Sequence, residues 1–269
     1  MKVTQPIIMG VLNVTPDSFS DGGKFFNASS AIDQAKSMVE NGAGIIDIGG
    51  ESTRPGAQAV AAKEELKRVI PVIEALSGEI KIPISIDTSK PEVMEQAVAS
   101  GASIINDVNA LRAEGAIEMA AKLKSDVCLM HMQGIPRTMQ DNPSYDDVVE
   151  DIKSFFKERI EACELAGIEL SSITLDPGFG FGKNLGHNIA LLKNLSEFNE
   201  FGVSILAGLS RKSMIGTLLG DKDVDSRMIG SVTAALIAVE NGANIIRAHD
   251  VAETNDALKV WQQIKNFRE

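Results

Sequence analysis

Three short segments follow one pattern, and each places a polar side chain where a buried strand should end. The segments are GAGIIDIG, GASIINDV and GANIIRAH, which begin at Gly42, Gly101 and Gly242. Each carries a polar residue five positions after its first glycine: Asp47, Asn106 and Arg247. Polar groups are costly to bury without partners, so their recurrence at one strand position indicates that they meet in a common site.

Two carboxylates and an amide form a set suited to a flat ligand with several N–H groups. Asp87 and Asp176 close the strand-like runs PISIDTS and SITLDPG, and Asn106 closes the run SIINDV. A carboxylate accepts two neighbouring N–H bonds in one plane, whereas an amide both donates and accepts. The three residues therefore predict recognition of a guanidine-like edge, as found in pterins and guanines.

Basic residues gather at the same predicted end of the strands. Arg247 and His249 close the run NIIRAHD, and the segment SRKS at 210–213 follows the run SILAGLS. Ser213 would lie near a helix N-terminus, where free N–H groups and the helix dipole attract anions. The pattern favours an anion site, with the alternative that the Arg-Lys pair of SRKS is a solvated loop pair.

Composition narrows the class of protein. A hydrophobic content of 44% allows a sizeable core, and the net charge of −11 disfavours binding to nucleic acid or anionic membranes. The histidines (His131, His187 and His249) and the cysteines (Cys128 and Cys163) show no metal-ligand spacing and no disulfide framework. No apolar run approaches the roughly 20 residues of a membrane span. We therefore expect a cytoplasmic protein acting on small molecules.

Short apolar runs alternate with amphipathic helical patterns along the chain. The predicted strands cover 7–14, 44–50, 83–89, 103–108, 126–132, 172–178, 204–210 and 244–250. Helical patterns at 30–42, 62–78 and 145–167 each end at a glycine, which predicts left-handed caps. Eight strand–helix units in about 250 residues predict a (β/α)₈ TIM barrel in one α/β domain over 1–269. An open doubly wound sheet is the alternative, but the chain lacks a G-x-G-x-x-G turn.

A barrel explains the repeated segments. Alternate strands fill each interior layer, so the even strands would place a ring of polar residues at the C-terminal mouth: Asp47, Asn106, Asp176 and Arg247. The odd strands add Asn13, Asp87 and Met130 nearby. The connections at 13–27 and 49–59 exceed the usual length of about two to six residues, which predicts flaps over this mouth.

Eight motifs follow in order, one for each strand–helix unit: NVTPDSFSDGG, GGESTRPG, SIDTSKPEV, IINDV, LMHMQG, DPGFGFGK, SRKS and RAHDV. Together they resemble the dihydropteroate synthase family over essentially the whole chain. The resemblance implies a (β/α)₈ transferase of folate synthesis that joins 6-hydroxymethyl-7,8-dihydropterin diphosphate to 4-aminobenzoate and releases diphosphate. It also implies Mg²⁺ as the cofactor, inhibition by sulfonamides and a homodimer.

The same resemblance implies roles for individual residues. The pterin ring would be held by Asp87, Asn106, Asp176 and Lys212, with Met130 packing on it. The diphosphate would be held by Thr53, Arg247 and His249, with Asn13 as ligand to Mg²⁺. The aminobenzoate site would be shaped by Phe19, Pro55, Phe181, Lys212 and Ser213. The flaps contain Asp17 and Arg54. The expected catalytic residues are Asp87, Asp176, Lys212, Arg247 and His249. From the layer argument, Asp47 is expected to orient Arg247.

The implied mechanism breaks the C–O bond to diphosphate first, and the arylamine then attacks a pterin-stabilised cation. It needs no protein nucleophile, and the sequence shows no Ser-His-Asp or Cys-His set. One alternative is a barrel that presents methyltetrahydrofolate to a corrinoid protein, although the NVTPDSFSDGG flap and SRKS argue against it. A non-catalytic binding protein is the other, and the intact set of polar residues at the mouth disfavours it.

Overall fold

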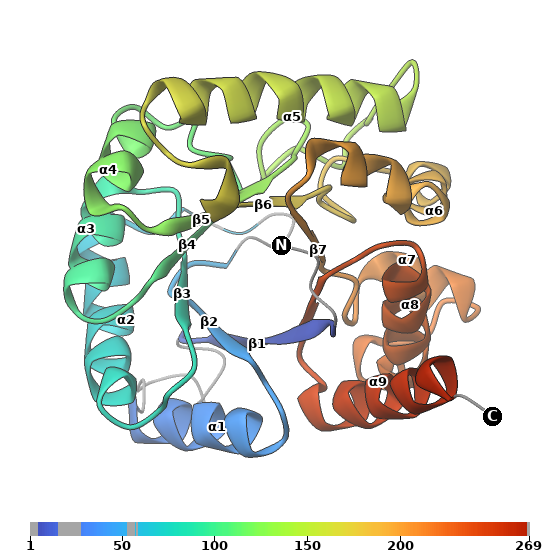
Figure 1. Cartoon of the computed structure of the whole chain (residues 1–269), viewed down its shortest axis with the longest axis horizontal. Coiled ribbons are helices and arrows are strands. Elements are labelled where there is room, and N and C mark those ends of the chain that lie inside the picture. Colours follow the sequence, from blue (N-terminus) through green and yellow to red (C-terminus); the bar gives the residue numbers. More distant parts are fainter. Residues whose placement is uncertain (1–4, 16–27, 53–56, 58, 268–269) are drawn as a thin grey trace.

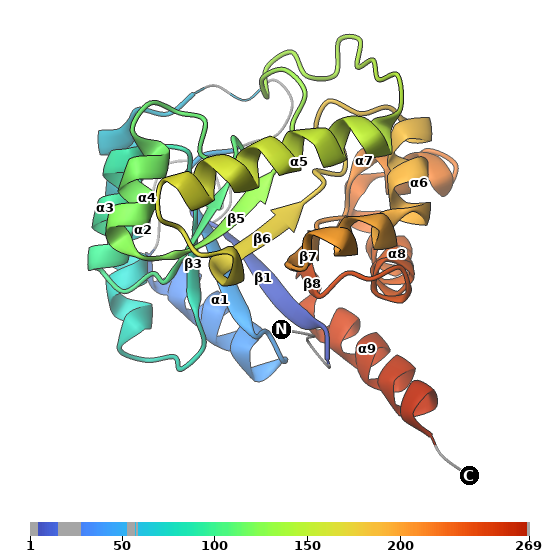
Figure 2. The ribbon, with the colours of Figure 1, turned by 45° about the horizontal axis from the view of Figure 1, so that its top comes forward.

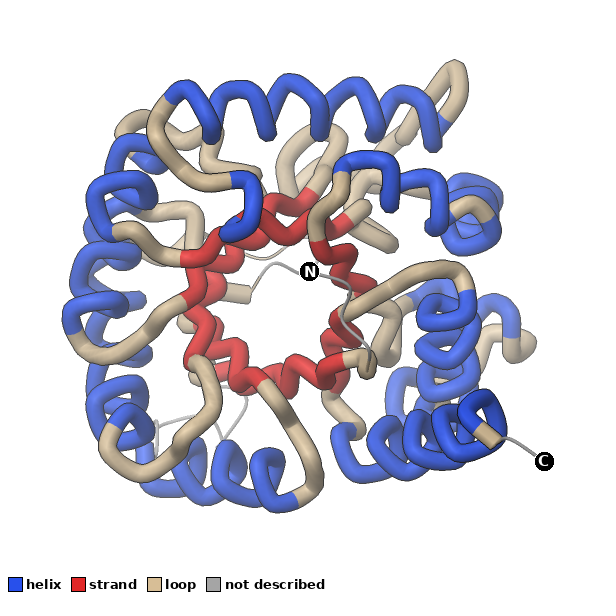
Figure 3. The backbone as a smooth tube through the Cα atoms, viewed as in Figure 1, coloured by secondary structure: helices blue, strands red, loops and turns tan. Residues whose placement is uncertain are grey.

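Eight parallel strands close into a barrel in the computed structural model, which describes residues 5–15, 28–52, 57 and 59–267. The strands form the central ring in Figure 3, and the helices surround it. In chain order they are β1 (Ile7–Asn13), β2 (Ile45–Gly49), β3 (Ile84–Asp87), β4 (Ile104–Asp107), β5 (Asp126–Met130), β6 (Ile173–Asp176), β7 (Ser204–Ala207) and β8 (Ile245–Ala248). The barrel prediction is confirmed, and the open sheet is wrong because β8 pairs with β1.

Helices follow the strands and cover the outside of the barrel (Figure 1). The α-helices are α1 (Ala28–Glu40), α2 (Ala62–Ser77), α3 (Pro91–Ala99), α4 (Ala116–Leu123), α5 (Val148–Leu165), α6 (Leu185–Lys193), α7 (Ser213–Leu218), α8 (Met228–Glu240) and α9 (Val251–Asn266). Short 3₁₀ turns are η2 (Leu170–Ser172), η3 (Leu195–Phe201) and η4 (Val224–Ser226). In Figure 2 the last helix, α9, runs out to the C-terminus at one side of the barrel.

The protein has two apolar regions, one outside the barrel and one inside it. The larger one lies between the strands and the helices, and includes Ile46, Ile48 and Phe156, which are fully buried. The smaller one is a cluster of Met9, Ile45, Cys128, Leu206 and Ile245, with Ile104 packed against it. Successive strand residues face opposite sides of a sheet. The second cluster therefore fills the interior below the mouth, while the isoleucines of the first face outward as predicted.

The helix ends follow local sequence with one exception. Gly42 and Gly167 adopt φ angles of 102° and 92°, so the predicted left-handed caps of α1 and α5 are confirmed. Gly78 is a correction, because its φ is −86°. Its N–H and those of the next two residues all bond to the carbonyl of Leu76, which continues a right-handed turn beyond α2.

Among the described residues, we find no helix with the length and apolar character needed to cross a membrane.

Candidate active site at the barrel mouth

Asp47 connects two other residues of the polar ring through hydrogen bonds. Its Oδ2 accepts hydrogen bonds from Arg247 Nε at 2.7 Å and from Asn106 Nδ2 at 3.0 Å. Each of these three residues comes two positions after a member of the interior apolar region: Ile45, Ile104 and Ile245. The period of two thus carries each strand from an apolar layer into a polar one. The predicted meeting of the three repeated segments is confirmed.

Arg247 joins the ring to the odd strands. Its Nη2 donates to Asp87 Oδ2 at 3.0 Å, so one guanidinium bridges the carboxylates of β2 and β3. Burial alone would lower the pKa of Arg247, but Asp47 and Asp87 outweigh burial and raise it. Burial raises the pKa of Asp87 to about 7, although Arg247 acts to lower it. The mouth therefore holds a carboxyl group that titrates near neutral pH.

Asp176 and Lys212 face the opposite side of the same mouth. Asp176 Oδ1 accepts from the Gly178 N–H at 2.8 Å, and Lys212 Nζ donates to the Phe179 carbonyl. A Cβ placed on Gly208 would lie 3.8 Å from Lys212 Nζ and 3.9 Å from Asp176 Oδ2. Because Gly208 has no side chain, the space beside it stays open, and both charged groups border that space.

Burial and charge set the protonation of this pair. Burial lowers the pKa of Lys212 to about 8, and Asp176 opposes that change. Burial raises the pKa of Asp176, while Lys212 and the Gly178 N–H act to lower it. The two groups stabilise each other's charged form, because each is the main favourable charge that the other meets.

Methionines form an apolar wall beside the charged groups. Met130 ends β5 in register with Asp176 and is 3% exposed. It packs in a cluster with Met132 and Met139, and Phe181 lies against that cluster. Lys212 Nζ lies 4.6 Å from the centroid of the Phe181 ring. A flat ring could thus lie on the thioether wall with polar groups at its edge.

Asn13 lies at the end of β1, across Gly49 from Asp87. The three residues are in register across β1, β2 and β3. A Cβ on Gly49 would lie 3.7 Å from Asn13 Oδ1 and 3.8 Å from Asp87 Oδ2. An amide oxygen and a carboxylate oxygen therefore face the same small space at the rim.

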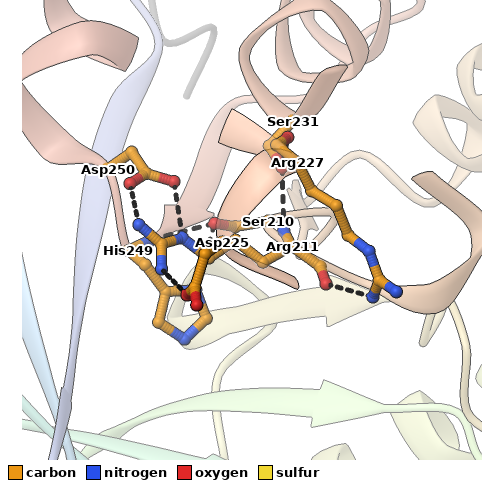
Figure 4. A network of polar contacts seen from close by, with 7 residues as sticks. All are labelled: Ser210, Arg211, Asp225, Arg227, Ser231, His249 and Asp250. Carbon is orange, nitrogen blue, oxygen red and sulfur yellow. Dashed lines mark hydrogen bonds and ion pairs between the residues drawn. The ribbon is translucent and has the colours of Figure 1, made fainter. Parts of the chain in front are cut away.

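The SRKS segment divides its two basic residues, as Figure 4 shows for Arg211. Arg211 Nε and Nη2 bond to the two carboxylate oxygens of Asp250 at 3.0 and 2.6 Å. Its backbone is left-handed, with φ of 59°, and its N–H donates to Ser231 Oγ at 2.8 Å. The expectation that Arg211 joins an anion cluster at the mouth is therefore wrong, and the alternative of a solvated pair is wrong as well.

Ser213 lies at a helix N-terminus, as the sequence predicts, and Ser210 contacts His249. Ser213 is the first residue of α7, a helix of 6 residues, and its side chain is exposed. The backbone N–H of His249 donates to Ser210 Oγ at 3.1 Å, and its Nδ1 lies 3.0 Å from the same oxygen. Ser210 thus fixes the ring of His249 at the end of β8 (Figure 4).

Sequence reasoning missed two buried groups near the mouth. Glu65 on α2 is fully buried and pairs with Lys90 at 2.5 Å, and Lys90 also pairs with Glu51 after β2. The helical period was a usable signal, since Glu65 shares the buried face of α2 with Val69. The second group surrounds Lys183, which is 3% exposed; it ends the motif DPGFGFGK, but no role was predicted for it.

Five predicted site residues lie outside the described residues: Asp17, Phe19, Thr53, Arg54 and Pro55. They belong to the two long connections that the sequence predicts as flaps. Those predictions remain untested.

The fold and the mouth together define a pterin-binding enzyme, and residues 9–249 match the family model described as "Pterin binding enzyme". The dihydropteroate synthase of Haemophilus influenzae is 54% identical over 266 residues, which cover 99% of this chain and 96% of that protein. The Escherichia coli K12 dihydropteroate synthase is 51% identical over 269 residues, covering 100% of this chain and 95% of that protein. The chain therefore belongs to the dihydropteroate synthase family, the transferases of that name in folate biosynthesis.

Solved structures agree with this assignment. The structure titled Xanthomonas albilineans dihydropteroate synthase with 4-aminobenzoic acid has a TM-score of 0.94 and 51% identity. The match covers 99% of this chain and 95% of that one. A second structure of the same protein, in complex with 7,8-dihydropteroate, has a TM-score of 0.90 and 47% identity, covering 100% and 97%.

Proposed function

We propose that the protein condenses 6-hydroxymethyl-7,8-dihydropterin diphosphate with 4-aminobenzoate to give 7,8-dihydropteroate and diphosphate. One observation carries the proposal. Residues from β3, β4, β6 and the β7–α7 connection converge on one mouth: Asp87, Asn106, Asp176 and Lys212. The complexes of a relative with 4-aminobenzoic acid and with 7,8-dihydropteroate support the same substrates.

The pterin ring would lie between the carboxylates and the methionine wall. Asp176 and Asp87 would accept N–H bonds from its guanidine-like edge, and Asn106 can donate and accept beside them. Met130 would pack on the ring face. Lys212, a donor, would meet a ring acceptor. This set explains why the interior polar layer contains acceptors of both charged and neutral type.

The other substrate groups would lie on the outer side of the mouth. Arg247 and His249 are the cations at the end of β8 and would hold the diphosphate oxygens, joined by Thr53. Lys212, Phe181 and Ser213 would contact 4-aminobenzoate, joined by Phe19 and Pro55. The carboxylate of that substrate would meet the first N–H groups of α7 beside Ser213.

The chemistry then requires stabilisation of charge rather than a protein nucleophile. The C–O bond between the pterin methylene and diphosphate breaks, and diphosphate leaves with the electron pair. Asp87 and Asp176 stabilise the cation spread over the ring, and Arg247 and His249 stabilise the departing anion. The arylamine nitrogen attacks the methylene, a C–N bond forms, and the nitrogen releases its proton to solvent. Asp47 holds Arg247 and Asn106 in place for both steps.

We further propose that Asn13 holds Mg²⁺. Its Oδ1 is a hard oxygen donor at the rim, facing the same space as Asp87 Oδ2, which fits an ion that takes one or two protein ligands together with phosphate oxygens. When bound, the ion would neutralise negative charge on the diphosphate.

The direct test is a coupled assay with purified protein, dihydropterin diphosphate, 4-aminobenzoate and Mg²⁺. We expect equal amounts of dihydropteroate and diphosphate, and competition by a sulfonamide against 4-aminobenzoate. The methyltetrahydrofolate alternative predicts tight binding of that folate without turnover of the diphosphate. That result would replace the proposed function.

We expect a bell-shaped dependence of kcat/KM on pH. Asp87, with a pKa of about 7, must lose its proton to accept ring N–H bonds, so activity rises as pH rises through that value. Lys212, with a pKa of about 8, loses its charge above that value, so activity falls again. A Lys212→Arg variant, whose guanidinium does not titrate, should lose the alkaline limb. A wild-type profile that is flat across both values would contradict these roles.

We also propose a homodimer built on α7 and α8. Three large apolar side chains on these helices are exposed: Leu218 by 54%, Ile229 by 75% and Ile237 by 44%. Sedimentation velocity should give a mass of two chains for the native protein and of one chain for Ile229→Lys, because a charge cannot be buried there without a partner. Leu165→Lys, at an exposed site on α5, is the matched control and should stay dimeric. A monomeric native protein would refute the dimer.

A cytoplasmic location and one domain over 1–269 complete the proposal. Cys128 and Cys163 are free and buried, as expected in a reducing compartment. The net charge of −11 favours small-molecule substrates over nucleic acid or a membrane surface.

A further inference from the structure

Lys183 is a buried lysine that the proposed reaction does not use. It is 3% exposed and lies between β6 and α6. Its Nζ lies 2.9 Å from His131 Nδ1, and donates to the carbonyls of Gly178 and Phe181 at 3.0 Å each. The His131 carbonyl lies 3.4 Å away as a further acceptor, so each N–H of Lys183 has an acceptor within reach.

No ion pair holds this lysine within the described part of the chain, where its partners are carbonyls and a histidine. Burial lowers the pKa of Lys183 well below its usual value, although the charge of Asp176 opposes that change. A buried cation without a bonded carboxylate reduces stability unless its hydrogen bonds are well formed. The position of Lys183 therefore depends on its hydrogen bonds to the carbonyls and to His131.

Its partners join two neighbouring segments of the mouth. His131 directly follows β5, while Gly178 and Phe181 belong to the 177–183 loop after β6. The loop is pressed against the β5 end so closely that a Cβ on Gly178, at φ of 73°, would lie 1.9 Å from the His131 carbonyl. The bonds from Lys183 to His131 and to the loop carbonyls hold the loop in this position.

The same loop presents the atoms that face the two charged site residues. The Gly178 N–H bonds to Asp176, the Phe179 carbonyl accepts from Lys212, and the Phe181 ring lies against Lys212 Nζ. Lys183 bonds to the carbonyls of Gly178 and Phe181. Two of the three site contacts come from these same residues, and the third comes from Phe179, which is next to Gly178.

We infer that Lys183, held by His131, is a positioning residue that fixes the 177–183 loop and thereby sets the affinity for the arylamine substrate. The inference rests on the proposed function, since that function places 4-aminobenzoate against Phe181 and Lys212. The pterin ring depends on this loop only in part: Asp176 and Lys212 bond to the loop, whereas Asp87 and Asn106 lie on β3 and β4.

His131 serves as an acceptor in this arrangement. Its ring packs edge-on against Phe155 with centroids 4.9 Å apart. Burial, followed by the charge of Lys183, lowers the pKa of His131 to about 2. The ring is therefore neutral at working pH, with its proton on Nε2 and the Nδ1 lone pair free to accept from Lys183.

The test compares Lys183→Met, which is one atom shorter, keeps an unbranched apolar side chain and removes the donors, with Lys193→Met on the exposed end of α6. We expect Lys183→Met to raise the KM for 4-aminobenzoate by about tenfold, and that for dihydropterin diphosphate by a smaller factor. Amide hydrogen exchange in a peptide covering 177–183 should also become faster. The Lys193 variant should match the native protein in both measurements.

A second pair of variants keeps the test decisive if Lys183→Met does not fold. His131→Asn places an acceptor oxygen at the position of Nδ1, whereas His131→Leu has no acceptor. We expect the KM for 4-aminobenzoate to rise in His131→Leu and to stay near the native value in His131→Asn. Equal values for the two variants would overturn the inference, as would unchanged constants and exchange in a folded Lys183→Met protein.

The proposed function and this inference can fail separately. An inactive native protein refutes the function by itself. An active native protein whose Lys183 variant raises both KM values equally, or neither, refutes only the positioning role.

Discussion

Replacing Asp176 with asparagine is expected to lower kcat/KM by about tenfold to a hundredfold. Hydrogen bonds to a charged group contribute about 1.5–3 kcal/mol each, which corresponds to this range of rates. Asparagine keeps an acceptor for the Gly178 N–H, which lies 2.8 Å from Asp176 Oδ1, so the loop contact can survive. The loss would then report the missing charge opposite the pterin ring.

Stability separates this effect from damage to the fold. Because burial raises the pKa of Asp176, the folded protein disfavours its ionised form, and a neutral amide removes that cost. The same change takes from Lys212 the main charge that opposes the fall in its pKa, so we expect the Asp176→Asn protein to stay folded but to lose some stability in thermal unfolding. Asp126→Asn, at the exposed start of β5, is the control and should leave the kinetics unchanged. Near-normal kinetics in the Asp176 variant would show that the pterin is held elsewhere.

Replacing Arg247 with methionine is expected to cost about 3–5 kcal/mol of unfolding free energy near neutral pH, because it leaves buried charges without a partner. Arg247 is the shared cation of Asp47, which is fully buried, and of Asp87, which is 8% exposed. Activity should fall as well, since the same guanidinium would hold the diphosphate. Urea unfolding of the purified variant measures the loss.

The pH dependence of this loss has a defined sign. The pKa of Asp87 in the folded protein is raised to about 7 from 3.8, so the folded state binds more protons than the unfolded state between those values. The contribution of Asp87 to stability therefore falls as pH rises across that window. Arg247 acts to lower this pKa, so its removal extends the window to higher pH. The deficit of Arg247→Met should thus grow as pH rises through about 7.

Arg211→Met provides a matched control, since Arg211 also pairs with a carboxylate but its side chain is 33% exposed. Exposed and partly exposed pairs contribute about 0–1 kcal/mol, so we expect a small loss without this pH dependence. Adding Asp47→Asn to Arg247→Met should recover part of the stability, because it removes one of the stranded charges. An Arg247→Met protein as stable as the native one at pH 8 would refute the bridging role.

Local sequence patterns were enough to predict the barrel and most of the ring at its mouth. Strand and helix periods are local properties, and both the position of Asp47 and that of Arg247 followed from counting alternate residues along β2 and β8. Parallel strands in chain order bring their carboxyl ends together, so residues 200 positions apart were expected to meet, and they do. Local pattern was enough because alternation along each strand decides which of its side chains face the barrel interior.

Only the tertiary structure decided which neighbours bond. Nothing local shows that Arg211 turns to Asp250 while Lys212 faces the mouth, because the left-handed backbone at Arg211 is fixed by contacts from Ser231 and Asp250, which are 20 and 39 residues away. The motif DPGFGFGK contains Lys183, but the contacts of this lysine could not be predicted for the same reason. Its acceptors are three backbone carbonyls and the ring of His131, and backbone carbonyls are chemically alike in every residue until folding places them.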